Sequence, residues 1–357
     1  MPTPAITFEA LKAGYGDCLL VDCPVGRRTW RLLVDTGPDE CLPAVVERLA
    51  AIPLNAAGKR WIDLAVISHI DHDHIGSAAR LVADASLKLE FGDIWFNAPK
   101  RPKTRGVAEG IGLAAVLGSS AKGLPWNLAF GARDVVTGPE LFCEVPHKRG
   151  EPRITLLSPT RETLDDLYKV WEREVPKVKV PPEPKPIFST REALDVPALA
   201  ARSTPEDRAP ANGSSIAFLI EHKGASALLT ADAFPSVLKN ALDALARNRR
   251  QALPWTIDLM KLSHHGSRAN TTSSLLDVVR APHVVVSTNG AIFGHPDGEG
   301  IARVVLHGLP GTRLWFNFQT EHTAPWANAE LQRCYGYSAI FAPPGKAGVV
   351  VALERRR

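Results

Sequence analysis

The amino-acid sequence predicts an α/β fold, and two observations support this prediction. Short apolar runs typical of β-strands alternate along the chain with longer segments in which apolar residues recur every three to four positions, as in amphipathic helices. The chain has 357 residues, of which 45% are hydrophobic, so it can bury a large core. We therefore expect a globular protein that forms a single domain over residues 1–357.

The expected strands are spread along the whole chain. They lie at residues 5–8, 18–22, 31–34, 64–67, 94–96, 154–157, 216–220, 227–229, 259–262, 284–287 and 314–316. Helical patterns fall between several of them, at residues 42–51, 75–85, 161–174, 235–247 and 273–279. Strands interleaved with helices favour sheets that are covered by outer helices.

Residues 175–211 interrupt this alternation because they are rich in proline, which fixes φ and removes backbone donors. We expect an extended insertion here, not a domain. The segment leads directly into Asn212, and one hypothesis is that it covers the site as a lid that a regulatory protease could cut at its basic residues. The alternative is a solvent-exposed linker.

The densest group of metal-capable side chains follows the apolar run at residues 64–67. It consists of His69, Asp71, Asp73 and His74. Alternate residues of an extended segment point the same way, so the first three can converge on one side while a bend lets His74 approach a second ion. So many ionisable groups behind a hydrophobic strand are costly unless a cation neutralises them. A solvated acidic turn is the alternative.

This segment resembles the metallo-β-lactamase superfamily, whose signature is H-x-H-x-D-H at the end of a strand. Asp71 stands in place of the second His, and the H-x-D-x-D-H variant is similar to the hydrolase domain of ComEC-type DNA-uptake proteins and their stand-alone relatives. The resemblance runs through most of the chain. It implies an αββα sandwich of the metallo-β-lactamase type with a dinuclear metal site.

Three further aspartates lie in segments that match the family in order. The glycine-rich stretch at residues 13–21 is similar to the opening hairpin of the family, and it makes Asp17 a candidate for supporting the ligands from behind. The resemblance assigns Asp35, at the end of the next strand, to ordering the metal loop. It assigns Asp232, which ends the apolar run at residues 227–229, to bridging both metals.

The later histidines complete the resemblance. Residues 258–267 look like the His-His-Gly-Ser motif of the family, in which we assign His264 to metal and His265 to metal or catalysis. Gly266 and Ser267 are small enough to let backbone amides approach an anionic substrate. His295 lies in a Gly-His-Pro element and is a catalytic candidate, although a plain turn with an exposed imidazole would look the same.

The chain departs from the usual superfamily pattern at one ligand. No histidine in a suitable strand-end context lies between the first motif and Asp232. Asn212, in a segment that resembles the Asn-x-Ser-Ser element of the ComEC-like branch, stands there and could contact metal or substrate. A site with more oxygen donors favours Mn²⁺ or Mg²⁺ over the nitrogen-rich surroundings of catalytic Zn²⁺. We expect two divalent ions, Mn²⁺ first, then Zn²⁺, with Mg²⁺ a further candidate.

Two such ions would activate a water for hydrolysis, with Asp73 orienting it and His295 or His265 assisting the leaving oxygen. We expect a phosphodiesterase or nuclease that acts on DNA or RNA. The net charge of +4 permits such a partner. A basic cluster that could bind phosphate, or simply be solvated, consists of Lys100, Arg101, Lys103 and Arg105. A small-molecule hydrolase and a non-catalytic metal-binding protein are the alternatives.

The sequence also predicts a cellular compartment. The N-terminus lacks the basic-then-apolar layout of a secretory signal, and no apolar run is long enough to span a membrane. The five cysteines are odd in number and lack the paired spacing of a metal site. We therefore expect a cytoplasmic protein with free thiols and no membrane partner. Its oligomeric state does not follow from the sequence.

Overall fold

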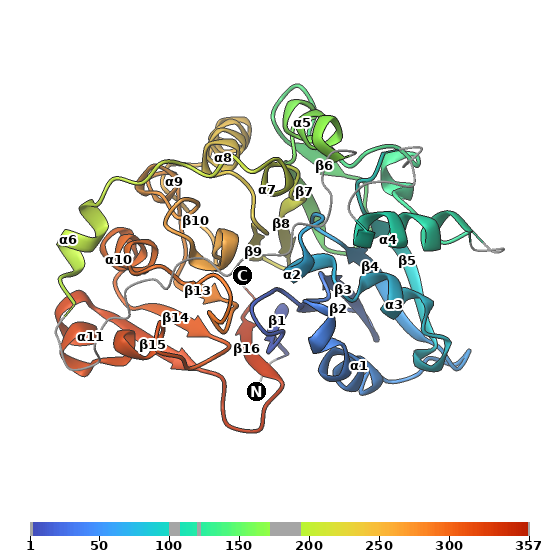
Figure 1. Ribbon diagram of the computed structural model, residues 1–357, viewed down its shortest axis with the longest axis horizontal. Coiled ribbons are helices and arrows are strands. Elements are labelled where there is room, and N and C mark those ends of the chain that lie inside the picture. The colour runs from blue at the N-terminus through green and yellow to red at the C-terminus, as the bar shows by residue number, and fades with distance from the viewer. Residues whose placement is uncertain (1–2, 100–107, 120–122, 172–193, 356–357) are drawn as a thin grey trace.

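The computed structural model describes residues 3–99, 108–119, 123–171 and 194–355. Within these ranges the strands form a six-stranded sheet, an eight-stranded sheet and a short parallel pair, β10 (Trp255–Thr256) with β12 (Val279–Arg280). The two large sheets face each other, with helices on their outer sides (Figure 1).

The six-stranded sheet has the order β16-β1-β2-β3-β4-β5. Its strands are β1 (Ile6–Leu11), β2 (Leu19–Val25), β3 (Arg28–Val34), β4 (Arg60–Val66), β5 (Leu89–Trp95) and β16 (Gly348–Leu353). Neighbours from β16 to β3 pair antiparallel, whereas β3, β4 and β5 are parallel. The sheet therefore joins the N-terminal strands to the last strand of the chain.

The eight-stranded sheet has the order β15-β14-β13-β11-β9-β8-β7-β6. Its strands are β6 (Cys143–Val145), β7 (Arg153–Ser158), β8 (Ala217–His222), β9 (Ala225–Leu229), β11 (Leu259–Lys261), β13 (His283–Val286), β14 (Thr312–Phe316) and β15 (Tyr337–Phe341). Strands β9, β11, β13, β14 and β15 run parallel, so their carboxyl ends meet along one edge.

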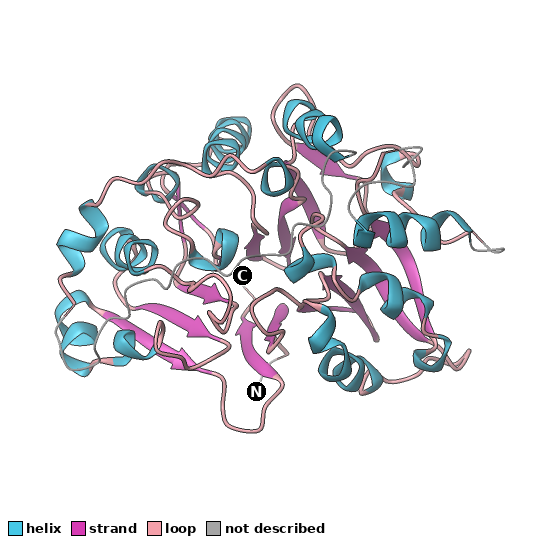
Figure 2. Ribbon diagram, in the orientation of Figure 1, coloured by secondary structure: helices cyan, strands magenta, loops and turns pink. Residues whose placement is uncertain are grey.

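The helices form the two outer layers (Figure 2). They are α1 (Leu42–Ala50), α2 (His72–Ile75), α3 (Ala78–Ala83), α4 (Ala108–Ser119), α5 (Arg161–Trp171), α6 (Val196–Ala201), α7 (Pro210–Gly213), α8 (Pro235–Arg249), α9 (Ser273–Leu276), α10 (Gly298–His307) and α11 (Ala329–Tyr335). None of those in the described ranges combines the length and apolarity needed to cross a lipid bilayer.

Successive side chains of a strand point to opposite faces of its sheet, and this explains the layers of sheets and helices. In β2, Leu19 and Val21 pack between the two sheets, whereas Leu20 packs beneath the outer helices. In β9, Ala227 and Leu229 face the other sheet and Leu228 faces the opposite helix layer. Because β2 and β9 bury residues on both faces, their sequences contain short apolar runs. The predicted αββα sandwich is confirmed.

The expected strands are present, with ends shifted by a few residues, but three predicted features differ. The helix expected at residues 75–85 is two short helices, α2 and α3, with a break at Gly76, where an added Cβ would lie 2.7 Å from the carbonyl of His72. The sequence analysis did not predict α4, α10, β15 or β16.

The third difference is the Pro-rich insertion. Its residues 175–193 lie outside the described ranges, but the rest contains α6 and the start of α7 and is not simply extended. Pro197 and Pro210 stand in the first turns of these helices. A proline is tolerated there because the backbone N–H that it lacks would have no partner inside the helix.

Candidate metal centre

The predicted ligands meet where strands of the two sheets end. His69 to His74 follow β4 of the six-stranded sheet and enter α2, while Asp232 follows β9 and His264 follows β11 in the eight-stranded sheet. Because β9 and β11 are parallel neighbours, their ends lie at the same edge. The backbone joins them there, since the amide of His264 donates to the carbonyl of Ala231 at 2.9 Å.

Asp232 lies at the centre of this cluster. Its Oδ1 is 3.3 Å from Nε2 of His74. Its Oδ2 is 3.8 Å from Nε2 of His69, 3.7 Å from Nε2 of His264 and 4.0 Å from Nε2 of His265. One buried carboxylate therefore faces four imidazoles that come from both sheets.

The side chains around Asp232 fall into two groups. The buried half consists of Asp73, His74 and His265, all at most 3% exposed, and their ligand atoms together with those of Asp232 lie within 4.8 Å of one another. The open half consists of His69, Asp71 and His264. His69 is buried, but the side chains of Asp71 and His264 are 37% and 22% exposed. Nε2 of His69 lies 3.8 Å from Oδ2 of Asp71.

Three of the four imidazoles have Nδ1 held by an acceptor. Nδ1 of His74 lies 2.8 Å from Oδ2 of Asp35, and Nδ1 of His265 lies 2.8 Å from the carbonyl of Ser287. Nδ1 of His69 lies 3.0 Å from the hydroxyl of Ser68, which itself donates to Asp35. A neutral imidazole that donates from Nδ1 has its lone pair on Nε2, the atom that faces Asp232, so it can bind a cation there.

The fourth imidazole, that of His264, is held by a different set of residues. Its Nδ1 lies 3.0 Å from Oδ1 of Asn270 and 3.4 Å from Oδ2 of Asp207. Nδ2 of Asn212 also donates to Asp207, at 2.5 Å. Asp207 belongs to the insertion and Asn270 to the loop after the His-His-Gly-Ser motif. Sequence analysis assigned no role to either.

The backbone at the end of β11 has an uncommon conformation. His264 and His265 have φ of 48° and 55°, and Gly266 follows with 86°. Non-glycine residues rarely adopt this left-handed region, and where they do the conformation is often part of a functional site. Here the turn directs two consecutive imidazoles towards Asp232, whereas consecutive residues of a regular strand point to opposite faces.

Asp17 lies behind the buried half. It forms an ion pair with Lys261, and both side chains are at most 1% exposed. Its Oδ1 is 3.5 Å from Nδ1 of His265. The hairpin that carries it fits closely, since the amide of Asp17 donates to the carbonyl of Asp73 and a Cβ added to Gly16 would lie 1.8 Å from that carbonyl oxygen.

The charges of the cluster shift the pKa values of its members. Burial opposes the ionisation of Asp17, but Lys261 and His265 together bring the pKa of this carboxyl below its usual range. Burial would lower the pKa of His265, but Asp17 and Asp232 raise it to about 9. Burial and the neighbouring His74 lower the pKa of His69 to about 4.

The cluster fits a divalent cation. Nε2 of His69, Nε2 of His74 and Oδ1 of Asp232 are buried and have no hydrogen-bond partner among the residues described. Such atoms are costly unless something binds them. Ligand atoms about 2.0–2.2 Å from one ion lie within roughly 4.4 Å of one another, close to the spacing in the buried half. The mixture of carboxylates and imidazoles suits Mn²⁺ as well as Zn²⁺.

The remaining predicted residues lie around this cluster or outside the described ranges. His295 is close, with its ring 5.1 Å from that of His264 and its Nδ1 3.5 Å from Oδ2 of Asp297. The amide of Ser267 is engaged with the carbonyl of His264 at 2.8 Å, and its hydroxyl accepts from Ala269. The basic cluster Lys100, Arg101, Lys103 and Arg105 falls outside the described residues.

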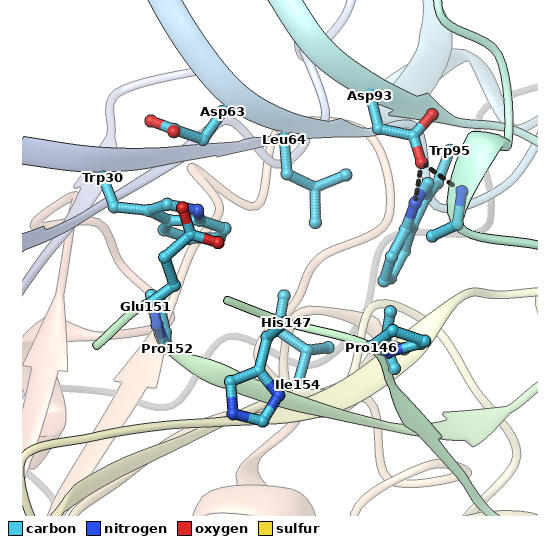
Figure 3. Close-up of a pocket in the computed structure, with 12 residues that line it drawn as sticks. Trp30, Asp63, Leu64, Asp93, Trp95, Pro146, His147, Glu151, Pro152 and Ile154 are labelled. Atoms are coloured by element: carbon cyan, nitrogen blue, oxygen red, sulfur yellow. Dashed lines mark hydrogen bonds between the residues drawn. The ribbon is translucent and has the colours of Figure 1, made fainter. Parts of the chain in front are cut away.

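A separate pocket of about 130 Å³ opens between β3, β4, β5 and β7 (Figure 3). It is lined by Trp30, Asp63, Leu64, Asp93, Trp95, Ala129, Val145, Pro146, His147, Glu151, Pro152 and Ile154, none of which belongs to the metal cluster. Asp93 accepts four N–H donors, and Asp63 and Glu151 both pair with Arg28. Its carboxylates are therefore already engaged within the protein.

Solved structures of the metallo-β-lactamase fold align with nearly the whole chain. YhfI from Bacillus subtilis is 13% identical, with a TM-score of 0.44 and coverage of 97% of this chain and 99% of that one. Zn²⁺-bound PqqB from Methylobacterium extorquens is 11% identical, with a TM-score of 0.47 and coverage of 97% and 100%. The short form of human tRNase Z is 10% identical, with a TM-score of 0.43 and coverage of 98% and 99%.

The described residues form an αββα sandwich of two facing sheets between outer helices. No family model matches the sequence, and no curated protein matches it. The candidate site lies at the edge of this sandwich where the ends of β4, β9 and β11 converge.

Sequence reasoning missed the residues that support the ligands. Lys261 had a usable signal, because a lysine in an apolar strand next to a ligand motif has to be paired when it is buried. Asp207 had none, because its partner His264 is distant in sequence and the contact depends on tertiary packing. Asn270 lies only six residues after His264, but an asparagine in a loop has no pattern that marks it as a support of a ligand.

Proposed function

We propose that this protein is a metal-dependent hydrolase in which two divalent ions share Asp232. The observation that carries the proposal is the position of this carboxylate among four imidazoles, with Oδ1 towards His74 and Oδ2 towards His69, His264 and His265. A buried carboxylate placed between two groups of imidazoles suits a bridging ligand. Asp73, His74 and His265 would hold one ion, and His69, Asp71 and His264 the other.

Two bound ions would lower the pKa of an attacking water and stabilise negative charge on the attacked group and the leaving oxygen. The protein residues would orient the water and move protons. Asp73, whose Oδ2 is 3.3 Å from Nε2 of His265, is placed to orient the water or accept its proton. His295, with Nδ1 towards Asp297, is placed at the open half to donate a proton to the leaving oxygen.

The proposed substrate is a phosphodiester of DNA or RNA. Support comes from the H-x-D-x-D-H variant, which resembles the ComEC-like branch, and from the number of carboxylates around the site, which suits Mn²⁺. The open half supplies the entrance, because Asp71 and His264 are the members of the cluster that reach solvent. We propose Mn²⁺ as the working ion, with Zn²⁺ second.

A substrate panel tests this proposal. Metal-stripped protein is reconstituted with Mn²⁺, Zn²⁺ or Mg²⁺ and incubated with linear duplex, circular and single-stranded DNA, RNA, bis(4-nitrophenyl) phosphate and a β-lactam. Cleavage of polymers supports the nuclease. Turnover of only the small ester or the lactam would replace it with a small-molecule hydrolase, and two bound ions without any turnover would favour a binding protein.

The panel needs a matched pair of variants. Asp73→Asn should abolish hydrolysis while the protein stays folded. His147→Ala removes an exposed histidine that lines the separate pocket, and it should leave hydrolysis unchanged. The reverse result would move the active site to the pocket of Figure 3.

A further inference from the structure

One residue of the Pro-rich insertion, Asp207, contacts side chains of the metal cluster. We propose that Asp207 is a positioning residue for the open half, which acts on His264 through Asn270 and on Asn212 directly. This rests on the proposed function only in that the cluster holds ions. The proposal assigns a function to one carboxylate of the Pro-rich insertion.

Asp207 is engaged on both oxygens. Its Oδ2 accepts from Nδ2 of Asn212 at 2.5 Å and from Nδ2 of Asn270 at 3.1 Å, and it lies 3.4 Å from Nδ1 of His264. Its Oδ1 accepts from the amide of Ala209 at 2.9 Å. These contacts hold the carboxylate in one orientation, with its side chain only 11% exposed.

The contact with Asn270 determines the tautomer of His264. Nδ2 of Asn270 donates to Asp207 and also to the carbonyl of Asp232 at 3.2 Å. With its amide nitrogen committed to two acceptors, Asn270 presents Oδ1 to Nδ1 of His264 at 3.0 Å. Nδ2 of Asn212 also lies 3.4 Å from this Nδ1, but it donates to Asp207 at 2.5 Å. The nearer oxygen of Asn270 therefore favours the proton on Nδ1. The lone pair of His264 is then on Nε2, which faces Oδ2 of Asp232 at 3.7 Å.

The contact between Asp207 and Asn212 also orients Oδ1 of Asn212. Since Nδ2 of Asn212 donates to Asp207, its Oδ1 is turned away from that carboxylate. This oxygen is buried and has no hydrogen-bond partner among the described residues. A buried amide oxygen without a partner is a candidate ligand for a hard cation. Asp207 therefore supports an imidazole nitrogen and an amide oxygen at the same half of the cluster.

The loops that carry Asp207 and Asn270 are fixed to each other by one buried arginine. Arg303 of α10 is 4% exposed, and its guanidinium donates to both loops. The acceptors are the carbonyls of Arg202, Arg268 and Thr271 and the hydroxyl of Thr204. The described end of the insertion is thus packed as a wall of the site.

Metal titration of variants tests the proposal. Asp207→Ala should weaken one of the two Mn²⁺ ions by roughly 10- to 100-fold and leave the other unchanged, the range found when a residue that orients a metal ligand is lost. Glu206→Gln is the control, because it removes the adjacent charge at a residue that makes no hydrogen bond or ion pair within the described ranges. Isothermal calorimetry gives both affinities.

A second measurement does not depend on metal or on hydrolysis. In metal-free protein labelled with ¹⁵N-histidine, at a pH high enough for His264 to be neutral, the Nδ1 and Nε2 shifts should report a single tautomer with the proton on Nδ1. Asp207→Ala should mix the two tautomers. If Asp207→Ala does not fold, Asp207→Asn keeps the size and one acceptor oxygen, and it should weaken the same ion by a smaller factor.

Two results would overturn the proposal. Equal weakening of both ions would mean that Asp207 acts on the whole fold, and unchanged affinities with an unchanged tautomer would mean that Asn270 alone holds His264. Absence of hydrolysis in every variant, with these affinities behaving as expected, would reject the proposed function and leave the role of Asp207 intact.

Discussion

The two halves of the metal cluster share Asp232 but are built by different parts of the fold. In the buried half, His74 and His265 are held by groups at the ends of core strands, the carboxylate of Asp35 after β3 and the carbonyl of Ser287 after β13. In the open half, His264 is held by Asp207 and Asn270, which both lie in loops.

Because of this difference, the buried half has rigidly held ligands and the open half is accessible to solvent. The ligands of the buried half cannot move without disturbing two sheets, because their partners are at most 1% exposed. In the open half, Asp71 and His264 reach solvent and the supports of His264 lie in loops, whereas His69 is buried and is held through Ser68 by Asp35. We infer that one ion is bound by a preformed site and that substrate enters over the other.

The most severe test removes the shared carboxylate. Asp232→Ala should abolish binding of both ions and lower hydrolysis by about 1000-fold or more, because metal ions contribute several kcal/mol of transition-state stabilisation and about 1.4 kcal/mol is a factor of ten. Elemental analysis gives the ion count. Retention of one tight ion would show that the halves do not share this ligand.

The buried ion pair of Lys261 with Asp17 lies behind the buried half of the cluster. Lys261→Met should lower the free energy of unfolding of metal-free protein by about 3–5 kcal/mol, since it leaves Asp17 buried without its ion-pair partner. Urea denaturation measures this change. The double variant Lys261→Met, Asp17→Asn removes the stranded charge and should recover part of the loss, whereas additive losses would argue against the pairing.

The protonated His265 gives the metal-free protein a pH dependence. Its pKa, raised to about 9 in the fold against about 6.5 unfolded, means that the folded state binds the proton more tightly. This contribution is fully present below pH 6.5 and is lost as pH rises to about 9, with an upper limit of about 3 kcal/mol. Urea midpoints of protein in EDTA should fall over this range. In His265→Gln the fall should be smaller, and an equal fall would assign it to other groups.

The smallest change in ion binding is expected when a single ligand of the open half is removed. His264→Ala should weaken one ion roughly 100-fold, about 2.7 kcal/mol, and leave the other in place. His265→Ala should instead release the tighter ion. Competition with a chromogenic chelator distinguishes the two variants. If both lose the same ion, the division into halves is wrong.

Much of this fold was predictable because it depends on local patterns. Apolar runs placed the strands, and the motifs placed His69 to His74, Asp232 and His264 at strand ends that the structure brings to one edge. The strands β15 and β16 were missed although Gly336 and the turn at residues 343–345 precede them. The helix α10 was missed because it begins with Gly298 and Gly300, which are poor helix formers.

The supports of the cluster were less accessible to sequence reasoning. Asp207 contacts His264 across 57 positions (264 − 207), in a segment whose prolines favoured an extended linker. The amide of Ser267 was expected to meet substrate, yet it closes the turn on the carbonyl of His264. Both depend on the left-handed turn after β11, which no residue type in the sequence requires except Gly266.

That turn also has a mechanical consequence. His264 belongs to one half and His265 to the other, so a single peptide unit spans the two ion positions. Each ring is nevertheless held by its own partner, His264 by Asn270 and His265 by the carbonyl of Ser287. A change in the backbone of this turn should therefore displace both imidazoles, whereas a change at one partner should displace only one.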